Sequence, residues 1–219
     1  MKRLTNGIIA IIVIVAVIFI DQFVKIWVKT HFYYGEEFLV TDWFRLLFIE
    51  NNGMAFGMEI GSKLLLTAFR IIAVLAFCYY LWKIRHRIDL PKGYVICVAM
   101  ITAGALGNVI DCIFYGVIFN APHFPQVAEI FPADGGYGTL FQGRVVDMLY
   151  FPLCEWNWPD WLPWVGGEHF VFFQPIFNIA DASLCVSVAI LILFYAKYLS
   201  SPEEEKHVES EELADETMD

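Results

Sequence analysis

Charged residues are scarce in this sequence, and their scarcity excludes most classes of soluble protein. Only 17% of the 219 residues are Asp, Glu, Lys or Arg, whereas 58% are hydrophobic. A soluble monomer of this length needs far more polar surface to stay dissolved. Positively charged residues are the less frequent of the two kinds, with 14 Lys and Arg against 24 Asp and Glu. The basic face of a nucleic-acid-binding protein is therefore missing. The composition therefore predicts a membrane protein that does not bind nucleic acid.

Metal-binding and disulfide patterns are also missing. The five cysteines show neither a CxxC pattern nor the spacing of metal ligands, and the five histidines form no HExxH motif. Four of the cysteines fall in or at the ends of apolar runs, where a thiol behaves as a small hydrophobic group. The sequence therefore predicts neither a disulfide framework nor a zinc site.

Four apolar runs are long enough to cross a bilayer. We predict membrane helices over residues 7–28, 64–82, 94–114 and 177–199. The first run resembles a signal peptide, but no small-x-small cleavage site follows it, so we expect it to remain as a helix. The predicted fold class is an all-α membrane protein: a bundle of about four transmembrane helices with a small β-containing outer segment and an extended outer loop.

Basic residues near the ends of these runs predict the orientation of the bundle. Lys2 and Arg3 precede the first run, and the short connection 83–92 carries four basic residues, whereas the long connection 115–176 carries only Arg144. Lys and Arg accumulate on the cytoplasmic side of membrane proteins. We therefore expect both termini in the cytoplasm, and segments 30–63 and 115–176 on the outer face.

The segments outside the runs differ in character. Residues 38–40 and 44–49 form two short apolar runs that can pair as strands. Segment 115–176 is rich in Pro, Gly and Trp, which is typical of a loop at the membrane–water interface. At the C-terminus, nine acidic residues against one lysine predict a disordered tail. We divide the chain into a membrane domain, residues 1–200, and an acidic cytoplasmic tail, residues 201–219.

Ionisable and amide side chains occur inside or at the ends of the apolar runs, where their cost in lipid makes them candidates for function. They gather near the predicted outer ends of the helices. In chain order, they and the glycines beside them are Asp21, Gln22, Lys25, Asn51, Asn52, Gly53, Gly104, Gly107, Asn108, Asp111, Asp147, Asn178 and Asp181. Asp21 and Lys25 can pair across one helical turn, and the two glycines of the third run favour close helix packing.

Two aspartates stand apart as candidates for catalysis. Asp147 lies in the apolar stretch 145–151, where the outer loop returns to the membrane, and Asp181 follows Asn178 by three residues at the start of the fourth run. Two carboxylates in a partly dry site cannot both ionise easily, so the pair can act as general base and general acid on water. No serine–lysine or cysteine–histidine arrangement accompanies them, and we predict an aspartyl mechanism.

Taken in order, these polar blocks resemble the signal peptidase II family of bacterial lipoprotein signal peptidases. The blocks are Asp21-Gln22-x-x-Lys25, Asn51-x-Gly53-x-Ala55-Phe56-Gly57, Gly104-Ala105-Leu106-Gly107-Asn108-x-x-Asp111, Val145-Val146-Asp147 and Phe177-Asn178-x-Ala180-Asp181. The resemblance implies a membrane aspartyl endopeptidase of the bacterial inner membrane that cuts diacylglyceryl-modified prolipoproteins just before the lipidated cysteine. It implies no metal and no organic cofactor, and the expected partners are the prolipoprotein and membrane lipids, with the enzyme a monomer.

The resemblance also assigns roles to residues. Asp147 and Asp181 would be the catalytic pair. Positioning and bracing roles would fall to Asn51, Gly53, Asn108, Asn178, Asp21, Lys25 and Asp111. The family usually carries Arg directly after the Asp of the glycine-rich block, and here that position is Cys112. We expect Arg144, three residues before Asp147, to supply the missing guanidinium, and unchanged cleavage by Arg144→Ala would contradict this.

Other interpretations of the sequence stay open. A small ion- or proton-coupled transporter also uses intramembrane carboxylates, although a relay places them at several depths. A non-catalytic assembly protein would use the polar residues only for packing, and it would tolerate Asp147→Asn. For the enlarged loop regions 120–142 and 152–174, both interface packing and a substrate-selecting lid are compatible with the sequence.

Overall fold

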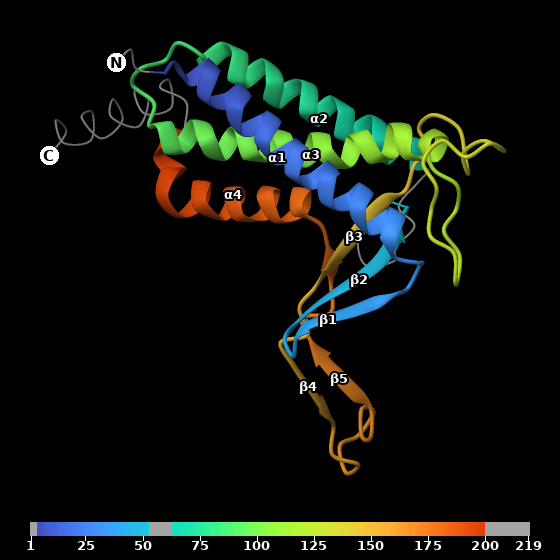
Figure 1. Cartoon of the computed structure of the whole chain (residues 1–219). Coiled ribbons are helices and arrows are strands. Elements are labelled where there is room, and N and C mark those ends of the chain that lie inside the picture. Colours follow the sequence, from blue (N-terminus) through green and yellow to red (C-terminus); the bar gives the residue numbers. More distant parts are fainter. Residues whose placement is uncertain (1–3, 53–62, 200–219) are drawn as a thin grey trace, which may run out of the picture.

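The computed structural model describes residues 4–52 and 63–199. In this part of the chain four long helices lie side by side in a bundle (Figure 1). They are α1 (Asn6–His31), α2 (Lys63–Ile84), α3 (Lys92–Ile118) and α4 (Ile179–Tyr195), the last continued by a short 3₁₀ turn, Ala196–Tyr198. All four are long and apolar enough, by length and composition, to cross a membrane, which confirms four long apolar helices at the predicted places. The predicted acidic tail, residues 201–219, lies outside the described residues.

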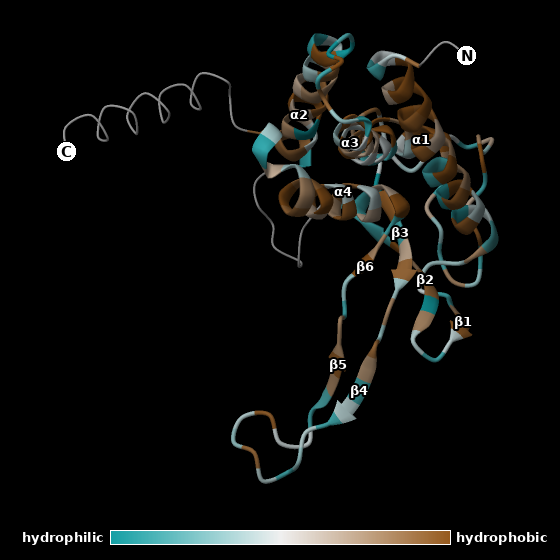
Figure 2. Ribbon diagram, turned by 90° about the vertical axis from the view of Figure 1, so that its left-hand side faces the viewer, coloured by the Kyte–Doolittle hydropathy of each residue, from teal (hydrophilic) through white to brown (hydrophobic). Residues whose placement is uncertain are grey.

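Helix α3 is the centre of the bundle. It packs against α1, α2 and α4 (Figure 2). In an apolar stretch of 18 residues, 67% of its residues are buried, compared with 17% to 22% in the equivalent stretches of the other three helices. Apolar side chains such as Phe19, Phe69 and Leu193 point outward instead. This distribution is expected where lipid rather than water surrounds the helices, because outward apolar groups then cost nothing.

The glycines of α3 let α4 and α1 approach closely, as the sequence predicted. A Cβ atom on Gly104 would overlap the backbone carbonyl oxygen of Ala180, and one on Gly107 would lie 2.7 Å from Oδ2 of Asp21. Both glycines therefore set the separation between α3 and the helices that carry polar residues.

Gly104→Ala is expected to destabilise the protein by about 1–3 kcal/mol, because backbone atoms of α4 must move to admit the methyl group. The thermal unfolding midpoint in detergent micelles measures this loss. Gly7→Ala is the milder comparison, since its Cβ would lie 3.2 Å from the Cβ of Arg85, a contact that a shift of a few tenths of an ångström relieves, and alanine is the better helix former. Equal midpoints for the two variants would contradict the packing role of Gly104.

A small antiparallel sheet covers one end of the bundle, which we call the sheet end (Figure 1). Its order is β1 (Glu37–Thr41), β2 (Phe44–Asn51), β3 (Val145–Tyr150) and β6 (Ile176–Phe177). The β1–β2 pair confirms the two strands predicted in segment 30–63. Segment 115–176 was predicted as an extended loop, and the structure shows that it contributes strands β3 and β6 to this sheet. Their ladders join distant parts of the chain, so the local sequence carried little signal for them.

The same segment contains a second hairpin, β4 (Cys154–Asn157) and β5 (His169–Phe172). It extends away from the helices (Figure 1). Trp156 and Phe170 pair across it with ring centroids 4.5 Å apart. Arg45 of β2 ties it to the larger sheet through Glu155, at 2.9 Å.

Apolar packing holds the larger sheet against the helices. Phe48 of β2 and Val146 and Met148 of β3 are fully buried in one cluster with Val28 of α1 and Tyr115 of α3. This packing places the middle of β3, and therefore Asp147, beside the sheet ends of α1 and α3.

Candidate active site

The N-terminus of α4 carries two of the predicted residues, and it begins differently from the prediction. The helix starts at Ile179, whereas Phe177 belongs to β6 and Asn178 is the N-cap. The Asn178 side chain accepts a hydrogen bond from the Asp181 amide at 2.9 Å, and the Asp181 carboxylate accepts one from the Asn178 amide at 3.4 Å. This capping box fixes both side chains at the strand–helix junction.

Asp147 lies in the middle of β3 and is 2% exposed. It is in register with Ile49 of β2, so the Asn51 side chain lies close by and donates to Oδ2 of Asp147 at 3.3 Å. The Asn178 side chain donates to the other oxygen, Oδ1, at 2.7 Å. Asp147 is therefore held by amides from two different elements.

Two amides link Asp147 to Asp181. Asn178 bonds both carboxylates, one through its side chain and one through its backbone. Asn108 of α3 donates to Oδ1 of Asp181 at 2.7 Å and accepts from Asn178 at 3.1 Å. The structure thus brings Asp147, Asp181, Asn51, Asn108 and Asn178 into one connected group, although they come from β2, β3, α3 and the start of α4.

The environment of Asp147 favours its neutral form. Burial raises the pKa of Asp147 from 3.8 to about 7, and the neighbouring charge of Asp181 adds to the effect. The hydrogen bonds from Asn178 and Asn51 act in the opposite direction but are weaker. Near neutral pH a large share of Asp147 is therefore protonated beside Asp181.

A buried ion cluster lies next to this group. The Lys25 ammonium is within 2.9 Å of Asp21 Oδ2 and 2.8 Å of Asp111 Oδ2, and it donates to Asn108 Oδ1 at 2.9 Å. The predicted Asp21–Lys25 pair is confirmed, and Asp111 joins it. Asp21 also accepts from the Ala180 amide at 2.9 Å. The cluster therefore fastens α1 and α3 to the first turn of α4.

A second charge cluster was not predicted from the sequence. Lys29 of α1 forms a fully buried ion pair with Glu50 of β2, and Glu50 also bonds the Arg144 guanidinium at 3.1 Å. The signal that could have revealed it is the spacing of Lys29 four residues after Lys25, which puts both on one face of α1. Arg144 was expected to supply the missing guanidinium, and the structure places it on Glu50. The group that contacts Cys112 is Arg70 of α2, with Nη1 3.4 Å from Sγ.

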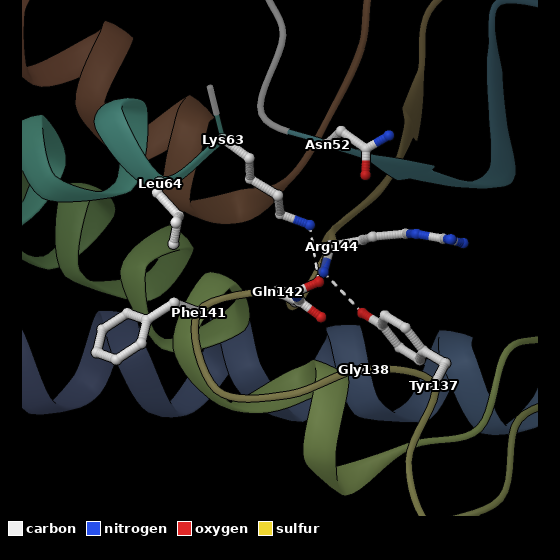
Figure 3. A pocket seen from close by; sticks show the side chains of 8 residues that line it. All are labelled: Asn52, Lys63, Leu64, Tyr137, Gly138, Phe141, Gln142 and Arg144. Carbon is white, nitrogen blue, oxygen red and sulfur yellow. Dashed lines mark hydrogen bonds between the residues drawn. The ribbon is translucent and has the colours of Figure 1, made fainter. Parts of the chain in front are cut away.

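A pocket of about 370 Å³ opens at the sheet end beside these clusters. Its lining residues are Asn52, Lys63, Leu64, Tyr137, Gly138, Phe141, Gln142 and Arg144. Lys63, the first residue of α2, reaches across to the Gln142 carbonyl oxygen at 2.7 Å (Figure 3). Gly53 and the rest of its predicted block, Ala55-Phe56-Gly57, lie outside the described residues. Among the residues that are described, no group of three or more His, Cys, Asp or Glu side chains is arranged to hold a metal ion.

The fold and this group of residues define a class of protein: a multi-span membrane protein with a carboxylate pair at one end of its bundle. Residues 13–197 match the model of the family described as signal peptidase (SPase) II. The chain belongs to this peptidase family, as the ordered polar blocks of its sequence predicted.

Known relatives agree with the match. The chain is 47% identical over 201 residues to the lipoprotein signal peptidase of Porphyromonas gingivalis, covering 91% of this chain and 88% of the relative. It is 37% identical over 181 residues to the lipoprotein signal peptidase of Amoebophilus asiaticus, covering 80% and 72%. A solved bacterial membrane enzyme superposes with a TM-score of 0.58 at 25% identity, covering 87% of this chain and 89% of the other.

Proposed function

We propose that this chain is a membrane aspartyl endopeptidase that removes the signal peptide from diacylglyceryl-modified prolipoproteins, cutting just before the lipidated cysteine. The observation that carries the proposal is Asn178, whose side chain and backbone bond Asp147 and Asp181 and hold the two carboxylates at one site. Membership of the signal peptidase II family and the names of the relatives support the substrate class.

In the proposed mechanism, the two aspartates share one proton and act on water. The ionised carboxylate takes a proton from the water, whose oxygen bonds to the scissile carbonyl carbon, while the neutral carboxyl donates its proton to the carbonyl oxygen. In the second step the amide nitrogen receives the proton taken from water, one hydroxyl of the intermediate returns its proton to the carboxylate that had donated it, and the C–N bond breaks, which leaves a carboxylic acid, an amine and the original pair. A pKa of about 7 suits Asp147 to hold the shared proton at neutral pH.

The remaining residues of the site take supporting roles in this proposal. Each of the three asparagines, Asn51, Asn108 and Asn178, donates to one of the carboxylates and so orients it. The cluster of Asp21, Lys25 and Asp111 braces the helices beneath them, because Asp111 also accepts from the Val146 amide at 3.3 Å, next to Asp147. Arg144 acts through its ion pair with Glu50.

We further propose that the sheet end faces the outer side of a bacterial inner membrane, with the enzyme a monomer. Support comes from the course of two helices. Helix α1 begins, and helix α4 ends, at the end of the bundle that lies opposite the sheet (Figure 1). That end also carries the basic connection 83–92, and basic connections stay in the cytoplasm. The pair of Asp147 and Asp181, the proposed catalytic dyad, then meets substrates at the outer membrane surface.

The test is cleavage of a purified precursor by the reconstituted protein, with and without the diacylglyceryl group on its cysteine. Modified precursor is expected to be cut at the bond before that cysteine. Unmodified precursor is expected to react at least about tenfold more slowly, because the acyl chains hold the scissile bond at the depth of the dyad. Failure to cut the modified precursor would contradict the proposed function, and equal rates would contradict the role of the lipid.

A further inference from the structure

Arg70 lies inside a predicted membrane helix, α2, and most hydrogen-bond donors of its guanidinium are unused. It lies seven residues after Lys63, about 10 Å along α2 from the sheet end. Within the described part of the chain, its one hydrogen-bond acceptor is Cys112 Sγ, and no carboxylate lies within 4.0 Å of it. A thiol is a weak acceptor, and a guanidinium offers five N–H donors. An intramembrane charge without a counter-ion is costly and indicates a functional role.

The contact between Arg70 and Cys112 lies close to the two aspartates. Cys112 follows Asn108 by four residues, so both project from one face of α3. Asn108 is the residue that donates to Asp181. Arg70 is therefore positioned one helical turn from the amide that holds the dyad, on the side of the sheet end.

The donors of Lys25 and Asn178 are already used. The three N–H groups of the Lys25 ammonium have three acceptors, Asp21, Asp111 and Asn108. The side-chain amide of Asn178 donates to Asp147, to Asn108 and to a backbone carbonyl. Arg70 consequently keeps free donors for another molecule, and unlike Arg144, which pairs with Glu50, it has no carboxylate partner among the described residues.

The pocket lies two helical turns along α2 from Arg70. Lys63 lines the pocket (Figure 3), and Arg70 follows it by two turns on the same face of α2. On the other side, Gln142 lines the pocket, and the next residue, Gly143, donates its amide to the Cys112 carbonyl oxygen at 2.9 Å. The pocket thus lies between the start of α2 and the segment that is bonded to α3 at Cys112.

We propose that Arg70 is a substrate-binding residue that donates its free N–H groups to carbonyl oxygens of the substrate beside the dyad. This inference rests on the proposed function. A peptide that is extended for cleavage loses its helical hydrogen bonds, and unpaired carbonyl groups are costly at membrane depth. A guanidinium with free donors at the level of the dyad satisfies them.

Arg70→Gln is expected to lower kcat/KM for the modified precursor by about tenfold to a hundredfold, the usual range for loss of a hydrogen bond to a charged group. Lys83→Gln, which removes an exposed cation from the other end of α2, is the matched control and should leave kcat/KM unchanged. Arg70→Gln within twofold of wild type would overturn the proposal. Absence of cleavage by the wild type would instead overturn the proposed function.

An exchange variant separates substrate binding from helix packing. Because Nη1 of Arg70 and Sγ of Cys112 are 3.4 Å apart, the double variant Arg70→Cys/Cys112→Arg returns a guanidinium to the same gap between α2 and α3, reached from the facing helix. The single variant Arg70→Cys is expected to lose activity as Arg70→Gln does, and the double variant should recover to within about threefold of wild type. No recovery in a double variant with a wild-type unfolding midpoint would overturn the proposal.

The carbonyl groups can belong to the peptide or to the esters of the diacylglyceryl group, and one comparison distinguishes them. The variants are assayed on two precursors, one with ester-linked acyl chains and one with ether-linked alkyl chains on the cysteine. An equal loss for Arg70→Gln on both precursors assigns the contact to the peptide. A loss confined to the ester-linked precursor assigns it to the lipid.

Discussion

Asp147→Asn is expected to abolish cleavage of the modified precursor, lowering kcat/KM by roughly 10³-fold or more, while the protein stays folded. The side chains are nearly isosteric, and the Asn oxygen can still accept the hydrogen bond that Asn178 donates at 2.7 Å. The variant cannot, however, exchange a proton with water or with the scissile carbonyl. Asp181→Asn should have an effect of the same size, because the two carboxylates work as a unit.

The pH dependence provides a second readout of Asp147. Its pKa is raised from 3.8 to about 7 by burial and by Asp181, so the folded protein binds this proton more tightly than the unfolded chain. Stability therefore falls as the pH rises from about 4 through 7, where the buried carboxyl ionises. Asp147→Asn removes this loss, and its thermal unfolding midpoint should exceed that of wild type at pH 8 but not at pH 4. For wild type, kcat/KM should fall above about pH 7 as the shared proton is lost.

Asp42→Asn is the control for both readouts, since Asp42 is exposed in the turn between β1 and β2. It should change neither the cleavage rate nor the difference in unfolding midpoint between pH 4 and pH 8. Retained cleavage in Asp147→Asn or in Asp181→Asn would exclude the dyad mechanism. An identical pH dependence of stability in wild type and Asp147→Asn would exclude Asp147 as the titrating group.

Lys25→Met is expected to be the most destabilising single change, costing about 3–5 kcal/mol. The ammonium is fully buried between Asp21 and Asp111, and both carboxylates are also buried. Without Lys25, two carboxylates face each other in a dry interior with no cation between them. The unfolding midpoint in detergent micelles measures the loss, and the cleavage rate should fall with it because Asp111 and Asp21 fasten β3 and α4.

Two comparison variants show whether the charge or the packing of Lys25 is responsible. Lys92→Met removes an exposed lysine from the start of α3 and should be nearly neutral. The triple variant Lys25→Met/Asp21→Asn/Asp111→Asn leaves no buried charge in the cluster and should recover much of the lost stability. A triple variant no more stable than Lys25→Met would show that packing, rather than an unpaired charge, causes the loss.

The sequence alone was sufficient for the four membrane helices and for the concentration of polar residues near one end of them. Hydrophobicity over about 20 residues is a local property, and so is the i, i+4 spacing of Asp21 and Lys25. The paired runs at 38–40 and 44–49 were also local, because a short turn joins β1 to β2. The ordered polar blocks were enough to predict the family.

Contacts between distant parts of the chain were decided only by the tertiary structure. Asn178 belongs to a cap rather than to a helix face, and its amide meets a carboxylate 31 residues away in β3. Arg144 pairs with Glu50, whereas Arg70, 42 residues before Cys112, reaches that thiol from another helix. Composition and spacing place each polar residue at a depth in the membrane. Which of them share a hydrogen bond depends on helix packing and strand register, and these are set by the whole chain together.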